Sequence, residues 1–200
     1  ISCDDSEQLS HVMESQLAEN ALTSTPTAPY LPNWDSLDSR PNPAWFENAK
    51  FGIFIHWGPY SVPAYTPKGM YSEWYQYWLN EKELYGNYDK AFSQSFVYDY
   101  HNETYGEDFT YEQFADDFKA DLFKPDDWAS LFEKAGAKYV VLTSKHHDGF
   151  ALWPSKEAND RGFPWNSMET GAKRDLVGEL TTEIKKTNIK MTLFGFSSPY

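Results

Sequence analysis

Three apolar segments, each ending in polar residues, constrain the fold of this chain more than any other feature. Written as sequence, they are FGIFI (51–55), YVVLT (139–143) and IKMTLF (189–194). Continuous apolar runs without in/out alternation are typical of parallel strands in sheets that helices cover on both faces. Such sheets carry their chemistry just beyond the carboxyl ends of the strands. The rings that follow these segments therefore mark a candidate site: His56, Trp57, His146 and His147.

Helical patterns fill the intervals between these strands. Apolar residues at helical spacing, together with start and stop signals, predict helices over 72–84, 111–119, 125–135 and 174–186. The residues expected to face the core are Trp128, Leu131 and Phe132 in the third helix and Leu176, Val177, Leu180 and Ile184 in the fourth. Strands that alternate with helices through short turns form βαβ units, whose crossovers are right-handed.

This order predicts an α/β fold, a (β/α)8-like TIM barrel of which the chain supplies the first three strands and helices. A doubly wound sheet is the alternative, but no glycine-rich dinucleotide or phosphate-binding motif follows any strand to favour it. We assign residues 41–200 to the N-terminal portion of the barrel. Residues 1–40, rich in Ser, Thr, Pro and acids, are assigned to a lipoprotein-like tail and linker.

The N-terminal tail resembles that of a lipoprotein. Ile1-Ser2-Cys3 is similar to the end of a bacterial lipobox, and acidic residues follow it. We expect an exported protein, periplasmic or at the cell surface, tethered through lipidated Cys3. In a eukaryote it would be lysosomal or secreted, and only there would the glycosylation sequon at Asn102 matter. The alternative is a chance cysteine. A loose helix is expected over Leu9–Leu22 and an extended linker over Thr23–Pro32.

Charge and composition narrow the class of partner. The net charge of -13, with lysines and arginines scattered, offers no basic surface to a nucleic acid. No apolar run reaches the ~18 residues that a membrane-spanning helix needs. Aromatic residues make up 18% of the chain. They indicate either a large aromatic core or a carbohydrate site, because Trp and Tyr present a flat apolar face and one polar group.

The adjacent His146 and His147 are the clearest sign of chemistry. Inside a strand they would point to opposite faces, but at a strand end that turns at Asp148-Gly149 both can enter one pocket. A neutral imidazole has one donor and one acceptor nitrogen, which suits the neighbouring hydroxyls of a sugar. Alternatively, one of the two rings caps a backbone carbonyl. We expect Asp148 to hold the turn and Lys145 to be a buried ion-pair partner.

His56 and the pair Glu73-Trp74 carry weaker signals. A metal site in a barrel would need a second histidine two residues after His56, where Gly58 stands. We therefore expect a direct substrate contact at His56, with no metal and no other cofactor. Glu73 and Trp74 open the helix that follows a long irregular segment. They are either site residues or, respectively, a first-turn acid that favours the helix dipole and a core indole.

Four motifs taken together resemble the α-L-fucosidases of glycoside hydrolase family 29. They are WFENAKFGIFIHWGPYSVPAY (45–65), SEWYQYWL (72–79), AGAKYVVLTSKHHDGFALW (135–153) and KRDLVGEL (173–180). The resemblance implies a (β/α)8-like catalytic domain, a β-sandwich beyond the chain, and an exo-acting retaining hydrolase. In that mechanism one carboxylate attacks the anomeric carbon, and a second carboxyl group acts first as acid and then as base. The resemblance places both beyond Tyr200, so no catalytic residue is expected within the chain.

The same resemblance implies which residues hold the terminal fucose of a fucosylated glycan. Those expected to bind its hydroxyls are His56, Glu73, Trp74, His146 and His147. Phe54 and Phe194 are expected to line the slot for its C6 methyl group, where the hydroxymethyl group of galactose would lose its water contacts unpaired. Two alternatives stay open: a catalytically inactive, surface-bound fucose- or glycan-binding protein, and a glycosidase acting on another deoxy or galacto sugar.

Overall fold

The computed structural model describes residues 30–84 and 94–196, with only the backbone of 81–84 and 94–95. The expectations for Cys3, for the helix over Leu9–Leu22 and for residues 23–29 of the linker fall outside these ranges. Contacts divide the chain into two units, Ile1–Lys50 and Phe51–Tyr200, which are described separately. The domain boundary between residues 40 and 41 stays a prediction.

The first unit contributes two short helices to the described part of the chain. Helix α2 (Trp34–Asp38) begins at Asn33, whose Oδ1 accepts a hydrogen bond of 2.9 Å from the backbone N–H of Ser36. This is a standard N-cap, which satisfies one of the backbone donors that a helix leaves unpaired. Helix α3 (Ala44–Ala49) follows Pro43, which is extended and supplies no side-chain cap.

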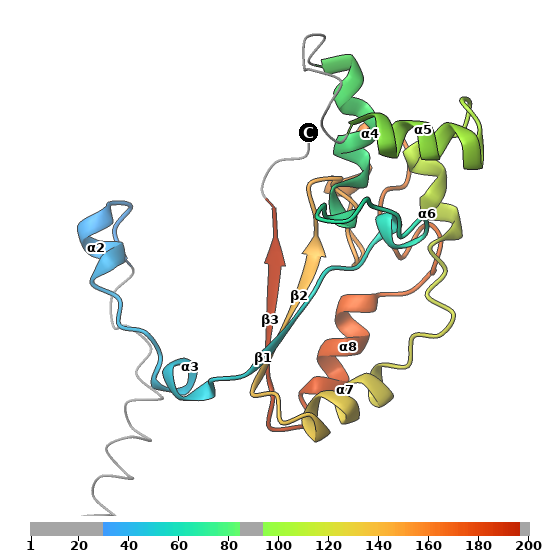
Figure 1. Ribbon diagram of the computed structural model, residues 1–200. Helices are drawn as coiled ribbons and strands as arrows, with labels where there is room; N and C mark the ends of the chain where they lie inside the picture. The colour runs from blue at the N-terminus through green and yellow to red at the C-terminus, as the bar shows by residue number, and fades with distance from the viewer. Residues whose placement is uncertain (1–29, 85–93, 197–200) are drawn as a thin grey trace, which may run out of the picture. The chain divides into compact units, whose positions relative to one another are not determined.

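A parallel sheet of three strands forms the centre of the second unit. The strands are β1 (Gly52–Ile55), β2 (Tyr139–Lys145) and β3 (Lys190–Gly195), paired in the order β1-β2-β3. The three predicted strands and their parallel pairing are confirmed, because each apolar run is long enough for one strand and too short for a stable helix. Figure 1 shows the strands pointing the same way, so their carboxyl ends meet at one edge.

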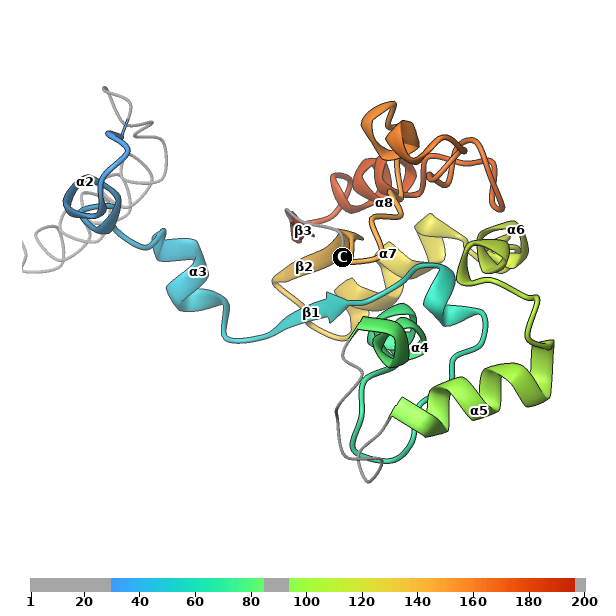
Figure 2. The ribbon, with the colours of Figure 1, turned by 90° about the horizontal axis from the view of Figure 1, so that it is seen from above.

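Helices and turns of the second unit lie along one face of this sheet and beyond its carboxyl-end edge (Figures 1 and 2). The α-helices are α4 (Tyr75–Leu84), α5 (Gln94–Tyr105), α6 (Phe114–Asp117), α7 (Pro125–Lys134) and α8 (Leu176–Ile184). The 3-10 turns are η1 (Pro59–Ser61), η2 (Ser72–Trp74), η3 (Tyr111–Gln113) and η4 (Glu157–Arg161). Figures 1 and 2 show α7 and α8 along one face of the sheet, whereas α4 and α5 lie beyond the carboxyl ends of the strands.

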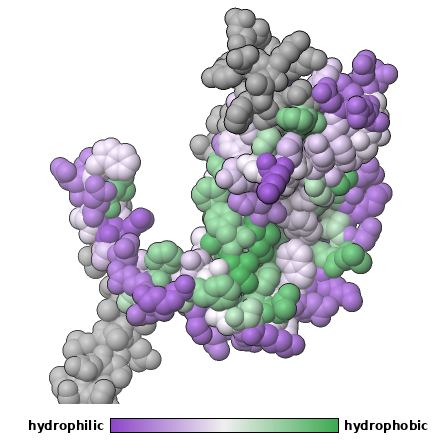
Figure 3. All heavy atoms as spheres, viewed as in Figure 1, coloured by the Kyte–Doolittle hydropathy of each residue, from purple (hydrophilic) through white to green (hydrophobic). Residues whose placement is uncertain are grey.

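The two faces of the sheet differ in burial. Val140 and Leu142 of β2 have no exposed surface and belong to the core that α7 and α8 complete. On the opposite face Phe54 is 52% exposed and Phe194 is 40% exposed. The expectation that helices cover both faces therefore holds for one face of the described sheet only. Figure 3 shows apolar surface, drawn in green, at the centre of this view of the molecule.

Helix α8 buries the residues that its pattern predicted, and α7 does so in part. Leu176, Val177, Leu180 and Ile184 are all buried, which confirms the inward stripe of α8. In α7 the prediction was wrong for Leu131, which is 61% exposed. Phe132 and Ala129 are the buried residues of that helix. They are three positions apart in the helix, so they share a face on which Leu131 does not lie.

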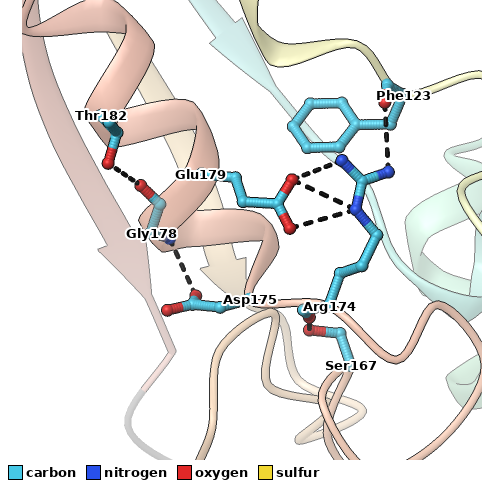
Figure 4. A network of polar contacts seen from close by, with 7 residues as sticks. All are labelled: Phe123, Ser167, Arg174, Asp175, Gly178, Glu179 and Thr182. Atoms are coloured by element: carbon cyan, nitrogen blue, oxygen red, sulfur yellow. Dashed lines mark hydrogen bonds and ion pairs between the residues drawn. The ribbon is translucent and has the colours of Figure 1, made fainter.

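A polar network fixes the start of α8 (Figure 4). The side chain of Asp175 accepts a hydrogen bond of 2.8 Å from the backbone N–H of Gly178, which makes it the N-cap. Arg174 forms an ion pair with Glu179, donates to the carbonyl oxygen of Phe123 at 3.1 Å, and lies 5.0 Å from the centre of the Phe123 ring. The arginine therefore ties α8 to the chain segment that precedes α7.

The segment between β2 and α8 is organised around Asn166. The side chain of this residue has no exposed surface, and its amide donates to the carbonyl oxygen of Ser155 at 3.2 Å and to Asn159 Oδ1 at 3.0 Å. The Asn166 side-chain oxygen accepts from the N–H groups of Met168 and Glu169. One buried amide thus uses both its donor and its acceptor capacity to hold a long connection in a single conformation.

Candidate functional site

Three imidazole rings converge at the carboxyl ends of β1 and β2. The ring centres of His56 and His146 are 5.5 Å apart, and those of His146 and His147 are 5.2 Å apart. His56 is exposed, His147 is half-buried, and His146 is only 3% exposed. The cluster thus has one ring at its base and two rings nearer the solvent.

The strand end allows His146 and His147 to face the same surroundings. Both rings contact the indole of Trp74, with centres 5.7 and 5.0 Å away. The pairing of β2 with β3 shifts register between Thr143 and Lys145, and such irregularities redirect the side chains that follow them. The chain then turns at Gly149, where φ is 77°, a conformation that favours glycine.

Burial and neighbouring charges keep His146 neutral. Desolvation, followed by the proximity of His56, His147 and Lys145, lowers the pKa of His146 to about 4. The ring therefore carries one donor and one acceptor nitrogen at physiological pH. A ring of this kind can accept a hydrogen bond from one hydroxyl and donate one to another.

Phenylalanine rings form an apolar wall beside the histidines. Phe54 lies 5.6 Å from Phe194 and 5.2 Å from His56, measured between ring centres. A third ring, Phe196, lies 4.9 Å from Phe194, 4.6 Å from His146 and 3.8 Å from His147. The wall therefore runs from the inner face of the sheet up to the imidazoles.

Glu73 and Trp74 both belong to η2, which places them beside the cluster. Trp74 contacts His146 and His147 directly, as described above. Glu73 is half-buried, and its charge contributes to the raised pKa of Tyr60, whose ring lies 5.6 Å from His146. The carboxylate of Glu73 is therefore electrostatically close to the base of the cluster.

Two residues that the sequence reasoning missed belong to this site. Phe196 directly follows β3, so the rule that selected the histidines at strand ends could also have found it. Tyr60 follows His56 in the loop after β1, and its hydroxyl oxygen is buried without a hydrogen-bond partner among the described residues. No sequence signal marks that hydroxyl, because its burial depends on the packing of η1 against the strand ends.

Trp57 does not join the site, although it follows the first strand. Its ring lies 5.1 Å from Phe118, 5.1 Å from Phe123 and 5.2 Å from Trp128. The indole is part of the core beside α7. The expectation that every ring after a strand lies in the site was therefore wrong for Trp57, since consecutive residues at the end of β1 point in opposite directions.

Asp148 holds the turn, as predicted. The side chain is 3% exposed, its Oδ1 accepts from the backbone N–H of Phe150 at 3.0 Å, and its Oδ2 accepts from the Tyr111 hydroxyl at 2.8 Å. Burial raises the pKa of Asp148 to about 6, although these hydrogen bonds act against the rise. Both oxygens are therefore engaged and hidden from any substrate.

Lys145 is not the buried ion-pair partner that we expected. None of the ion pairs in residues 30–84 and 94–196 includes it. The side chain is half-buried and lines a hollow of about 490 Å³ together with Trp153 and Arg161. Partial burial lowers the pKa of Lys145, with the Asp148 charge opposing this effect.

The side chains of the site suit the binding of a polyol beside one apolar wall. The neutral imidazole of His146 offers one donor and one acceptor, a carboxylate lies close by, and aromatic faces suit the C–H surfaces of a sugar. In the described part of the chain, no three His, Cys, Asp or Glu side chains are grouped so that they could hold a metal ion. No helix among those residues is long and apolar enough to cross a membrane.

Parallel strands with such a cluster at their carboxyl ends are typical of barrel-type carbohydrate-active proteins. Comparison with known proteins makes this specific: the model of the alpha-L-fucosidase family matches residues 16–198. The chain belongs to the alpha-L-fucosidase family.

Curated relatives and solved structures agree with this assignment. The chain is 46% identical over 165 residues to an alpha-L-fucosidase of Dictyostelium discoideum, covering 82% of the chain and 33% of the relative. It is 45% identical over 177 residues to the tissue alpha-L-fucosidase of Homo sapiens, covering 88% and 34%. The Thermotoga maritima alpha-fucosidase in complex with fucose is similar at 44% identity and a TM-score of 0.71, covering 84% and 37%.

These comparisons also confirm the fold class. The structural neighbours are alpha-L-fucosidases with a (β/α)8 catalytic domain, and the chain supplies three of its parallel strands. The chain spans about a third of the length of the curated relatives that it matches.

Proposed function

We propose that the full-length protein containing this chain is an exo-acting, retaining α-L-fucosidase that removes terminal α-linked L-fucose from glycans. One observation carries the proposal: the three imidazoles converge with Trp74 on one side and an apolar wall on the other. Membership of the alpha-L-fucosidase family supports the same conclusion.

Different residues of the site contact different groups of the sugar in this proposal. We propose that His56, His146, His147 and Glu73 bind its hydroxyls while the indole of Trp74 covers its C–H face. The neutral imidazole of His146 can donate to one hydroxyl and accept from the next, so that it recognises two neighbouring hydroxyls of the sugar ring together. A hexose without this hydroxyl pattern would leave some of these groups unpaired and would bind much more weakly.

The apolar wall supplies discrimination at C6. We propose that Phe54 and Phe194 contact the methyl group of fucose. A methyl group against two aromatic rings is favourable, whereas the hydroxymethyl group of galactose would lose its water contacts there without replacement. The difference between the two substrates then comes from desolvation rather than from a hydrogen bond.

Bond cleavage requires two carboxyl groups in a retaining enzyme. Asp148 does not supply the nucleophile, because both of its oxygens accept hydrogen bonds and the side chain is buried. We propose that nucleophile and acid/base lie beyond Tyr200. The residues of this chain then bind and orient the sugar so that the anomeric carbon meets a group from elsewhere in the barrel.

The direct test is release of L-fucose, or of nitrophenol from its aryl α-L-fucoside, by the full-length protein. We expect turnover of the fucoside and much slower turnover of the corresponding galactoside. Binding of fucose without release from any fucoside would instead identify an inactive sugar-binding protein. Preference for the galactoside would identify a glycosidase of another specificity. Either result would overturn the proposal.

A substitution pair tests the methyl pocket separately. Phe54→Ala should raise KM for the fucoside about tenfold or more. It should also lower the ratio of kcat/KM for the fucoside to kcat/KM for the galactoside. Phe51→Ala is the matched control, because Phe51 is similarly exposed (47% against 52%) but lies directly before β1, away from the carboxyl end of the strand. Equal effects of the two substitutions on the fucoside-to-galactoside ratio would contradict the assignment of Phe54.

We also propose export with a membrane tether at Cys3, on the support of the lipobox-like start of the sequence. Metabolic labelling of the full-length protein with a fatty-acid analogue should label the wild type and not Cys3→Ser. Equal labelling of the two would contradict the tether.

A further inference from the structure

The turn that carries His146 and His147 is held from three sides at Asp148. The carboxylate accepts from the Tyr111 hydroxyl at 2.8 Å and from the N–H of Phe150 at 3.0 Å. The carbonyl oxygen of Asp148 accepts from the indole N–H of Trp165 at 2.7 Å. The histidine pair is thus attached to η3, which precedes it in the chain by more than thirty residues, and to a segment that follows it.

The way in which Asp148 is buried makes it an unusual choice for a purely structural turn. The carboxylate is 3% exposed, and none of the ion pairs among the described residues includes it. Burying an ionisable group without a paired charge costs free energy, and the turn itself uses only the hydrogen bond from the N–H of Phe150. A carboxylate that accepts two hydrogen bonds in fixed directions is instead suited to orienting what is attached to it.

The neighbouring groups leave the turn little room to move. Tyr111 is buried and packs against Trp165, with ring centres 6.2 Å apart, and Trp165 packs against Phe150 at 5.1 Å. The N–H of Gly149 donates to the carbonyl oxygen of His146 at 3.0 Å. The direction of both imidazoles is therefore coupled to the Tyr111–Asp148 hydrogen bond through a short and well-packed path.

We propose that Asp148 is a positioning residue for sugar binding, which together with Tyr111 fixes the direction in which His146 and His147 face the pocket. It touches no substrate and acts only through the two histidines. This inference deepens the function proposed above and depends on it. Displacing binding groups by about 1 Å can reduce catalytic efficiency on the order of a hundredfold, so the effect should be large although the residue is hidden.

The test compares three variants of the full-length protein with one control. Tyr111→Phe removes one hydrogen bond to Asp148, and Asp148→Ala removes both. Asp148→Asn keeps the shape, since its amide oxygen can accept from the Phe150 N–H while its amide nitrogen donates to the Tyr111 oxygen. Thr170→Val is the control, because it removes a partly buried hydrogen bond of 2.8 Å from the buried Thr170 to the exposed Asp116, which joins the same two parts of the chain away from the histidines.

The measurements are the dissociation constant for L-fucose, kcat, KM and the melting temperature. We expect Tyr111→Phe to weaken fucose binding about tenfold and Asp148→Ala to weaken it about a hundredfold. Asp148→Asn and Thr170→Val should stay within about threefold of the wild type. The imidazole NMR signals of His146 and His147 should shift in Tyr111→Phe but not in Thr170→Val.

Specific results would overturn the proposal without touching the fucosidase activity itself. If Tyr111→Phe binds fucose as the wild type does, the hydrogen bond does not position the histidines. If Asp148→Asn loses as much binding as Asp148→Ala, the negative charge is what matters, and the positioning role is wrong. Should Asp148→Ala fail to fold, Tyr111→Phe with its control decides alone. A wild type that releases no fucose would refute the proposed function instead.

Discussion

The hydroxyl group of Tyr60 is an unsatisfied polar group beside the histidine cluster. It is buried and has no partner among the described residues, whereas the hydroxyl of Tyr111 donates to Asp148. A buried polar group without a partner costs about 1–3 kcal/mol. Burial, followed by the charges of Asp148 and Glu73, raises the pKa of Tyr60. The hydroxyl therefore stays protonated, and it can take part in hydrogen bonds but does not ionise.

We therefore expect Tyr60→Phe to leave the free energy of unfolding unchanged or to raise it by about 1 kcal/mol. Tyr111→Phe should lower it by about 1–2 kcal/mol, because a carboxylate loses its donor. Chemical denaturation of the two variants measures the contrast. Equal destabilisation would show that the Tyr60 hydroxyl has a partner after all. A loss of fucose binding in Tyr60→Phe alone would make the sugar that partner.

The pKa of His146 gives a second expectation at the scale of single residues. In the unfolded chain the ring titrates near its ordinary value of 6.5, but in the folded protein its pKa is about 4. As the pH falls from 6.5 to 4, His146 binds a proton in the unfolded state but not in the folded state. This residue therefore lowers the free energy of unfolding over that pH range. The raised pKa of Asp148 acts in the opposite direction, because the folded state gains its proton first.

Replacing His146 by Gln should therefore reduce the loss of stability on acidification. Melting temperatures of wild type and variant, measured from pH 7 to pH 4, should differ most in slope between pH 6.5 and 4. Parallel curves would contradict a neutral His146. Because the ring stays neutral in the folded state down to about pH 4, fucose binding by the wild type should persist at pH 5.

Single residues were predictable where position in a strand decides their place. His56, His146 and His147 were found because parallel strands end at one edge, and the structure brings them together. The same rule could have found Phe196, which follows β3, but Tyr60 was not predictable, since the burial of its hydroxyl depends on the packing of several segments. Whether the selected residues bind sugar stays a prediction until the binding measurements are made.

At the scale of elements, the beginning of α8 depends on one cap. Asp175 accepts from the N–H of Gly178, and loss of an N-cap costs about 1 kcal/mol. Asp175→Ala should lower the free energy of unfolding of the full-length protein by about that amount without changing KM. Asp175→Asn, which keeps an acceptor, should lose only a few tenths of a kcal/mol. Equal losses would show that charge rather than capping matters there.

Elements were predictable in proportion to their periodicity. The three strands and α8 have clear apolar patterns, and the structure confirms them within about two residues. Helix α5 was missed because its sequence, QSFVYDYHNETY, is mostly polar and aromatic without an apolar stripe. It is held instead by contacts within the fold, such as the hydrogen bond of 3.0 Å between the hydroxyl of Tyr75 and the Nδ1 of His101.

At the scale of the whole molecule, the chain leaves one face of its sheet uncovered within the described residues. On that face Phe54 is 52% exposed and Phe194 is 40% exposed, and patches of this kind are normally covered in a soluble protein. We expect the 200-residue chain on its own to bind a hydrophobic dye such as ANS, to self-associate, and to release no fucose. The full-length protein should bind little dye. A monomeric, dye-free chain would contradict this expectation.

The burial of the Asn166 side chain affects how fast this residue deamidates. An asparagine followed by serine is a sequence prone to deamidation, which begins when the next backbone nitrogen attacks the side-chain carbon. Here the nitrogen of Ser167 is occupied by a hydrogen bond of 2.8 Å to the carbonyl oxygen of Ala151, and Asn166 is sealed from solvent. Asn166 should therefore deamidate more slowly in storage than exposed asparagines do, although its sequence favours the reaction. This protection should last for as long as the segment between β2 and α8 keeps its folded conformation.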